Sequence, residues 1–344
     1  MKVFWNPTQF AHAPSFFLTR GTVRPNYEVP ARAEALLAAC HAMGMEVATP
    51  PPVDIASLLA VHEPEYLAFL RDGYAAWADI QDAGPEMVAN HHPSPEMLAN
   101  GGRAPANIVG QVGWFVADAA CPIGPHTWEA AFHAAAGAAA AADEAARGFN
   151  AYALARPPGH HAFKARAGGH CYLNNAAIAA ERLRAKGADR VAILDIDSHH
   201  GNGTQSIFWD RPDVLFVSIH GDPNRYYPWY TGHASERGGG DGAGCTLNLP
   251  LPIGTGDELW LDAVATGVAD ARAFRAEAVV VSLGFDASID EPLNALSVTA
   301  DGFARAGAAI GALGLPTAIV QEGGYNVDVI GGLLTRFLDG FGNP

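Results

Sequence analysis

The chain has 344 residues, which is enough for one α/β domain or for two smaller domains. Apolar residues make up 49% of it and charged residues 17%, a composition that excludes a disordered protein and allows a large core. The 36 Asp and Glu residues outnumber the 21 Lys and Arg residues, and this net charge of −15 argues against a nucleic-acid-binding protein, because a phosphate backbone would be repelled.

Short apolar runs alternate with Ala-rich stretches along the chain, a pattern typical of βαβ units and a mostly parallel sheet. The stretch 80–127 fits neither type of segment, so we expect a long irregular insertion there. In chain order the pattern predicts a strand at 2–5, helices at 31–43, 55–72 and 128–147, a strand at 151–155, a helix at 173–187, strands at 190–196 and 213–219, a helix at 257–275, a strand at 276–283, a helix at 299–313 and a strand at 316–321.

Polar segments follow five of the predicted strands directly. Open α/β sheets bind ligands outside the carboxyl ends of their strands, where loops converge over a rigid base. We therefore expect one functional site at this edge of the sheet. The five segments are RPPGHH (156–161), DSHHGNGT (197–204), HGDP (220–223), GFDAS (284–288) and EGGYN (322–326).

A candidate metal site lies where the predicted strand 190–196 runs into the segment DSHHGNGT. In extended chain, residues two apart share a face, so Asp195, Asp197 and His199 can point in one direction. Asp286, after another apolar strand, is a candidate third ligand beside Asp197 and His199. Three protein ligands leave positions open for catalysis, and zinc, iron, manganese and cobalt all suit such donors. The alternative, that Asp197 only caps a helix, is less favoured because so many costly polar groups gather here.

Two further features indicate acid–base chemistry. His160 and His161 follow two prolines that restrict the backbone, and a histidine pair near a metal-bound water suits a general base and a general acid. Asp195 and Asn202 are candidate partners for their second ring nitrogens. Tyr325 follows two glycines and could donate to an oxyanion. Taken singly, the histidine pair could be a surface turn and Tyr325 a structural tyrosine.

Five motifs in order and spacing resemble the histone deacetylase and acetylpolyamine amidohydrolase family. This resemblance covers about residues 1–340 and implies a single domain over 1–344 with the arginase/deacetylase-type fold. That fold is a three-layer α/β architecture with a mostly parallel sheet of about eight strands between helices. The motifs are RPPGHH, GGHCYLNNAAIAA (168–180), LDIDSHHGNGTQ (194–205), SLGFDAS (282–288) and QEGGYN (321–326).

The resemblance also implies roles for individual residues. Zn²⁺, with Fe²⁺ or Co²⁺ as alternatives, would be bound by Asp197, His199 and Asp286. The catalytic group would comprise His160, His161, Tyr325, the carboxylate partner Asp195, and Asn202, which stands where some members carry Asp. A structural K⁺ or Na⁺ would be held by Asp195, Asp197, His199, Ser218 and Ile219, and the acyl channel would be lined by Gly169, His170 and Tyr227, with His170 replacing the family's usual aromatic residue.

Tracts at 27–37, 124–131 and 218–228 look most like the bacterial acetylpolyamine-type members. The implied reaction hydrolyses the acetamide of small acetylated amines, such as acetylputrescine or acetylcadaverine, to acetate and a free amine. In those members an insertion matching 80–127 builds a homodimer and narrows the entrance, and an acidic entrance favours cationic substrates. Two acidic residues of that insertion match Val109 and Ala120, and the candidate replacements are Glu86, Glu96, Asp118 and Glu129.

Three other functions compete with this interpretation. A protein deacetylase acting on acetyl-lysine would share the motifs. An arginase-like enzyme would need an Asp two residues after Asp286, where the chain has Ser288. An inactive acetyl-binding module would lack a metal ligand or Tyr325.

The sequence also predicts a cytoplasmic protein. The start of the chain has no signal-peptide pattern, no run reaches the roughly 18 apolar residues of a membrane span, and the four cysteines lack CxxC spacing.

Overall fold

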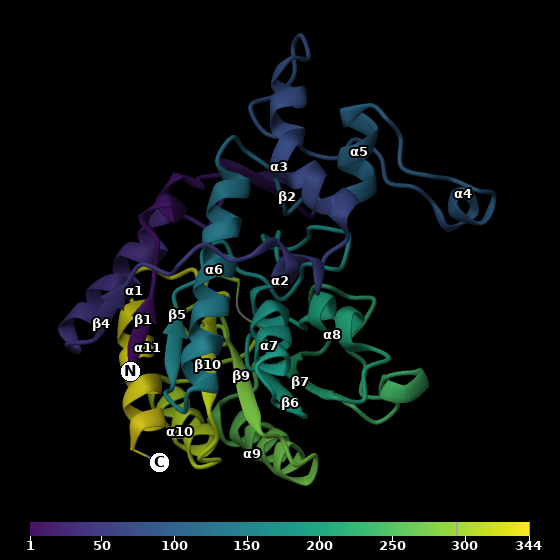
Figure 1. The fold of residues 1–344 in the computed structure, drawn as a ribbon. Coiled ribbons are helices and arrows are strands. Elements are labelled where there is room, and N and C mark those ends of the chain that lie inside the picture. The colour runs from purple at the N-terminus through teal and green to yellow at the C-terminus, as the bar shows by residue number, and fades with distance from the viewer. Residues whose placement is uncertain (294, 344) are drawn as a thin grey trace.

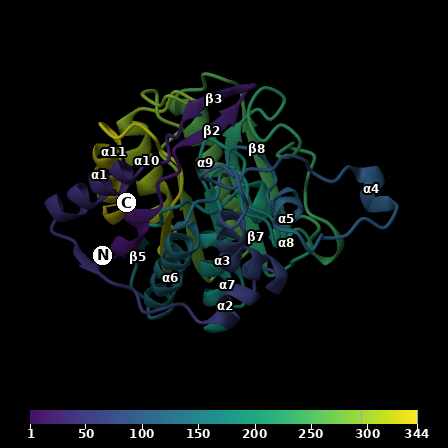
Figure 2. The same cartoon turned by 90° about the horizontal axis from the view of Figure 1, so that it is seen from above.

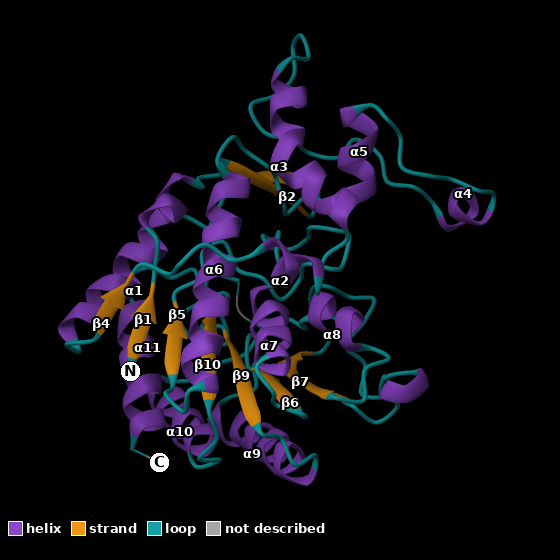
Figure 3. Ribbon diagram, viewed as in Figure 1, coloured by secondary structure: helices purple, strands orange, loops and turns teal. Residues whose placement is uncertain are grey.

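The computed structural model describes residues 1–293 and 295–343. Its centre is one sheet in which all neighbouring strands are parallel (Figure 3). The eight strands lie in the order β4 (Glu46–Ala48), β1 (Lys2–Phe4), β5 (Ala151–Ala153), β10 (Thr317–Gln321), β9 (Ala278–Leu283), β6 (Val191–Asp195), β7 (Val214–Gly221) and β8 (Thr246–Leu251).

Helices cover both faces of this sheet (Figures 1 and 2). One layer contains α6 (Thr127–Ala146) and α7 (Asn175–Ala185), and the other contains α1 (Pro30–Ala42), α9 (Asp257–Ala273), α10 (Ala300–Gly311) and α11 (Ile330–Gly342). Along β6, Val191 and Ile193 join the first core, and Ala192 and Leu194 join the second. Because both faces are buried, the strands are continuously apolar. The predicted three-layer α/β fold is confirmed.

The predicted helix at 55–72 is wrong as one element. The chain forms α2 (Ile55–Leu59) and then α3 (Pro64–Ala78). Pro64 has no N–H to donate and disfavours helical backbone in Glu63, which is extended at φ −72° and ψ 142°. The sequence analysis also did not predict β4, β8, α8 (Asn202–Phe208) or α11.

Two segments rise above the carboxyl edge of the sheet. The insertion contains α4 (Pro95–Ala99), which projects from the body in both views, and α5 (Ile108–Phe115) (Figures 1 and 2). An antiparallel hairpin, β2 (Phe16–Thr19) and β3 (Thr22–Pro25), leans on the end of this insertion, where Leu18 N donates to Ala119 O at 3.1 Å. Among the described helices, none combines the length and apolarity needed to cross a membrane.

Candidate active site

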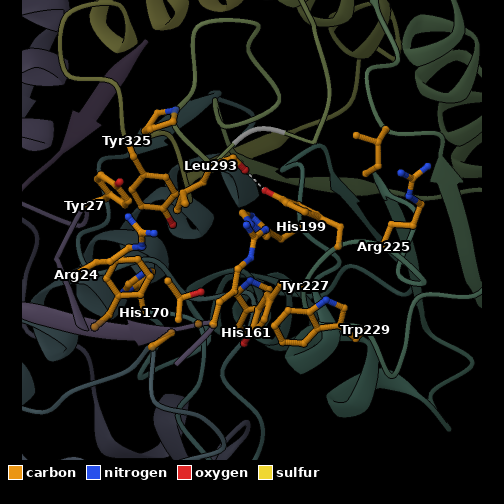
Figure 4. A pocket seen from close by; sticks show the side chains of 18 residues that line it. Arg24, Tyr27, His161, His170, His199, Arg225, Tyr227, Trp229, Leu293 and Tyr325 are labelled. Carbon is orange, nitrogen blue, oxygen red and sulfur yellow. Dashed lines mark hydrogen bonds between the residues drawn. The ribbon is translucent and has the colours of Figure 1, made fainter. Parts of the chain in front are cut away.

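The carboxyl ends of β5, β10, β9, β6 and β7 are neighbours in the sheet, so the five polar segments meet as expected. Above them lies a cavity of about 510 Å³ (Figure 4). His161, His199 and Tyr325 line its deep part, and Gly169, His170 and Tyr227 also line it. The structure therefore brings the three predicted channel residues to one pocket with His161 and Tyr325, whereas the other predicted catalytic residues, His160, Asp195 and Asn202, do not line it.

Asp197, His199 and Asp286 form a buried cluster whose possible ligand atoms all lie within 4.8 Å of one another. His199 Nδ1 lies 2.9 Å from Asp286 Oδ2 and 3.1 Å from Asp197 Oδ1. Burial disfavours a charged ring, yet the carboxylates of Asp286 and Asp197 raise the pKa of His199 to about 9. Two carboxylates and one imidazole are a donor set that suits a divalent metal.

Two glycines allow the carboxylates to approach so closely. A Cβ on Gly284 would lie 2.2 Å from Asp197 Oδ2, and a Cβ on Gly323 would lie 2.4 Å from Asp286 Oδ2. Backbone N–H groups hold the same carboxylates, because Gly323 N donates to Asp197 at 2.9 Å and Ser198 N donates to Asp286 at 2.8 Å. This cradle fits a cation that balances the two buried acids.

The paired histidines have the partners that the sequence predicted. His160 Nδ1 donates to Asp195 Oδ2 at 3.0 Å, His161 Nδ1 donates to Asn202 Oδ1 at 2.7 Å, and the ring centroids are 4.0 Å apart. Burial opposes a charge on His160, but Asp197 and Asp195 raise its pKa well above the usual value. Burial, with the neighbouring charge of His160, holds the pKa of His161 well below the usual value. The surroundings thus favour the charged form of His160 and the neutral form of His161.

Tyr325 is held by residues that the sequence analysis did not identify. Tyr325 N donates to both carboxylate oxygens of Glu291 at 2.8 and 2.9 Å. The guanidinium of Arg32 lies 4.9 Å from the Tyr325 ring centroid and donates to the backbone oxygens of Glu322 and Gly324. Arg32 is 1% exposed and pairs with buried Glu28 at 2.8 Å. Arg32 falls in the tract 27–37, but no pattern there distinguished it from a surface arginine.

Glu322 also supports the histidine pair. Its carboxylate accepts from Gly159 N at 2.6 Å and His160 N at 3.0 Å. The position of Glu322 directly after the buried strand β10 is the sequence feature that could have identified this role. Glu322, His160 and Cys171 also lie within 4.8 Å of one another, but burial raises the pKa of the Cys171 thiol well above its usual value, so it stays protonated and is a poor metal ligand.

The channel wall depends on Asp118. Tyr227 OH donates to Asp118 Oδ2 at 2.6 Å, and Gly169 N donates to the same oxygen at 3.2 Å. Gly169 has φ +51°, and a Cβ there would lie 2.4 Å from His161. Burial lowers the pKa of His170 to about 4, so this ring is uncharged at neutral pH, and it contacts Phe17 with centroids 5.5 Å apart.

The expected acidic entrance is not what the structure shows. The Asp118 carboxylate accepts from Tyr227 OH in the channel wall, and the Glu86 carboxylate accepts from Ser15 N at 2.6 Å. Glu96 and Glu129 are exposed on α4 and α6 and do not line the cavity. No Asp or Glu occurs among the described residues that line it, which instead include three arginines: Arg20, Arg24 and Arg225.

The residues expected around a monovalent cation also lie together. Asp195 on β6 pairs in register with Ser218 on β7, and Ile219 follows in the same buried strand. Ser218 Oγ lies 2.9 Å from His220 Nδ1. Burial raises the pKa of Asp195 to about 6. The binding of an ion by these residues stays a prediction.

Comparisons with known proteins agree with this geometry. Residues 26–341 match the model of the histone deacetylase domain. The chain is 45% identical over 344 residues to an acetylpolyamine amidohydrolase of Burkholderia pseudomallei, covering 99% of each chain, and 42% identical over 322 residues to one of Mycoplana ramosa, covering 93% of each. The crystal structure of acetylpolyamine aminohydrolase from Burkholderia pseudomallei matches with a TM-score of 0.96 at 45% identity, over 100% of this chain and 99% of that one. The resemblance is confirmed, and the chain belongs to the histone deacetylase family of amide-hydrolysing enzymes.

Proposed function

We propose that this protein removes the acetyl group from small acetylated amines and that acetylpolyamines, such as acetylputrescine and acetylcadaverine, are among its substrates. The observation that carries this proposal is the buried cluster of Asp197, His199 and Asp286, whose His199 lines the same pocket as His161 and Tyr325. The names of the relatives that match nearly the whole chain support the substrate class.

Asp197, His199 and Asp286 would hold one Zn²⁺, and Fe²⁺ or Co²⁺ suits the same donors. When bound, such an ion polarises a carbonyl and lowers the pKa of a water molecule, which makes the water nucleophilic at neutral pH. The buried carboxylates, held by backbone N–H groups and packed against glycines, favour this function over a cluster of unpaired acids.

The chain's own residues would move the protons. His161 keeps Nδ1 on Asn202, so its Nε2 is free to take a proton from water and return it to the leaving amine. His160, which donates to Asp195 and whose pKa that carboxylate raises, would add positive charge beside the reacting atoms. The hydroxyl of Tyr325 would donate to the acetamide oxygen as negative charge develops there.

The insertion at 80–127 would form a homodimer interface. Met97 and Leu98 on the projecting α4 are 48% and 41% exposed, and Val109 on α5 is 36% exposed. Apolar side chains on a projecting segment are stabilised when a second copy covers them. Replacing Met97 and Leu98 by Glu should therefore give a monomer by light scattering, and a wild-type monomer would contradict the dimer.

Three further assignments complete the proposal. The whole chain 1–344 would act as one deacetylase domain, and the protein would work in the cytoplasm. A K⁺ or Na⁺ ion would stabilise the base of the site through Asp195, Asp197, His199, Ser218 and Ile219. Unfolding measured in KCl, NaCl and a choline salt at equal ionic strength tests the ion, because only a bound ion makes the melting temperature depend on the cation.

The reaction is tested by kcat/KM for acetylputrescine, an acetyl-lysine peptide and an intact acetylated protein, measured with the metal-loaded enzyme. We expect acetylputrescine to be hydrolysed and the intact protein to be the poorest substrate, because a folded surface cannot enter the cavity. An enzyme that deacetylates intact protein best would overturn the proposed substrate class.

A further inference from the structure

Three arginines line the outer part of the cavity. Arg20 lies at the tip of the β2–β3 hairpin, Arg24 lies on β3, and Arg225 lies in the loop after β7. In Figure 4, Arg24 lies on the side of Tyr27, His170 and Tyr325, and Arg225 lies on the opposite side beyond His199. Two segments far apart in sequence thus place positive charge around one entrance.

The hairpin geometry fixes two of these arginines at the entrance. Arg20 and Gly21 both have positive φ, 50° and 73°, which is the backbone of a tight two-residue hairpin turn. Phe17 on β2 packs against Tyr27 and His170 with ring centroids 5.7 and 5.5 Å apart. The hairpin is therefore attached to the channel wall.

These arginines have no carboxylate partner within the described part of the chain: none of the ion pairs found there includes Arg20, Arg24 or Arg225. Arg225 acts electrostatically on Asp222 without forming an ion pair with it, and the Asp222 carboxylate accepts from both nitrogens of Asn224. An adjoining hollow contains Asp290, which is exposed, and Glu291, which is buried and accepts hydrogen bonds from the backbone of Tyr325 and Asn326. Arginine is charged at every accessible pH, so the entrance stays cationic.

We infer that the entrance binds the far end of an anionic substrate, so that the enzyme acts on linear acetamides ending in a carboxylate as well as on acetylpolyamines. The inference rests on the proposed deacetylase function and extends its substrate class. Arg guanidinium groups bind carboxylates through paired hydrogen bonds, and the aromatic wall of Phe17, Tyr27 and Tyr227 suits the methylene chain between the two ends.

Three substrates with the same four methylenes isolate the charge. These are ω-acetamidopentanoate, N-pentylacetamide and acetylputrescine, whose far ends are anionic, neutral and cationic. In the full-length, metal-loaded enzyme, Arg24→Gln should lower kcat/KM for the carboxylate substrate about three- to tenfold, raise it for acetylputrescine and leave the neutral substrate within about twofold. The change should appear in KM and not in kcat, because the arginine does not contact the acetamide.

Matched variants separate a local contact from a general change of charge. Arg24→Lys should retain part of the preference for the carboxylate substrate, because it keeps the positive charge but loses the planar guanidinium that forms paired hydrogen bonds. Arg305→Gln removes an equal charge from α10, away from the entrance, and should leave all three substrates unchanged. Combining Arg24→Gln with Arg225→Gln should lower the carboxylate preference further.

The outcomes distinguish this inference from the proposed function. If wild-type enzyme hydrolyses acetylputrescine and N-pentylacetamide, but Arg24→Gln shifts all three substrates by one common factor or shifts none, the anion-binding entrance is wrong and the deacetylase function stands. If wild-type enzyme hydrolyses none of the three, the deacetylase function is wrong and the inference is overturned with it.

Discussion

The floor and the rim of the cavity are built differently. At the floor, Asp197, His199 and Asp286 are buried, and each is fixed by hydrogen bonds from loops that follow strands of the sheet. At the rim, Arg20 and Arg225 are exposed and lie on a hairpin and a loop. Loops tolerate substitution better than the elements that they connect, so we expect charge changes at the rim to leave the buried floor in place.

Substituting a metal ligand at the floor should have the largest effect on activity. Asp286→Ala or Asp197→Ala should abolish metal binding and lower kcat/KM by roughly 10³-fold or more, since a bound metal supplies several kcal/mol of transition-state stabilisation. Metal analysis and acetate release measure both effects. Asp290→Asn, an exposed carboxylate in the adjoining hollow, is the matched control and should keep metal and activity. Full activity in the Asp286 variant would refute this role.

Tyr325→Phe tests the floor without removing a ligand. We expect bound metal to be unchanged and kcat to fall by roughly 10²–10³, the usual effect of deleting one oxyanion donor. The two measurements needed are metal content and the kcat for acetylputrescine. If kcat were unchanged, Tyr325 would have only a structural role, and the floor would consist of fewer groups than proposed.

His62 connects the channel wall to stability. Its Nδ1 donates to Phe163 O at 3.0 Å and its Nε2 accepts from Asn174 N at 2.9 Å, which ties down the segment that carries Gly169 and His170. Burial lowers the pKa of His62 from 6.5 to about 4, so the unfolded chain binds a proton that the folded chain does not. Its contribution is therefore fully present above pH 6.5 and lost as the pH falls towards 4.

Urea unfolding of wild type and His62→Gln at pH 7.5 and pH 4.5 measures this contribution. The wild type should lose about 2–3 kcal/mol more than the variant between these two conditions, because the pKa difference sets the size of the linkage. Equal pH dependence in the two proteins would show that His62 is not held neutral by the fold.

Tyr227 lies between floor and rim and should give the smallest effect. Tyr227→Phe removes the hydroxyl that donates to buried Asp118, and leaving that carboxylate without this donor should lower the free energy of unfolding by about 1–3 kcal/mol. We expect KM to rise and kcat to change little, because the reacting groups are untouched. A fall in kcat as large as that of Tyr325→Phe would place Tyr227 at the floor.

The sequence predicted the floor better than the rim. Asp197, His199, Asp286 and the histidine pair follow apolar strands directly, so their convergence could be expected from the sheet alone. Arg32, Glu28 and Glu291 act through contacts with distant segments, and no local pattern marks them. Arg32 donates to Gly324 O, Glu28 pairs with Arg156, and Glu291 accepts from Tyr325 N. The cationic entrance was missed for the same reason, since net charge says nothing about where the charges lie.

The single measurement closest to the central claim is a metal titration. Enzyme treated with a chelator and then dialysed receives increasing Zn²⁺, and acetate release from acetylputrescine is recorded against bound metal. The account predicts almost no activity at the start and a linear return that ends at about one ion per chain, as expected for one site with three protein ligands. Metal-free enzyme that releases acetate at the full rate would contradict it.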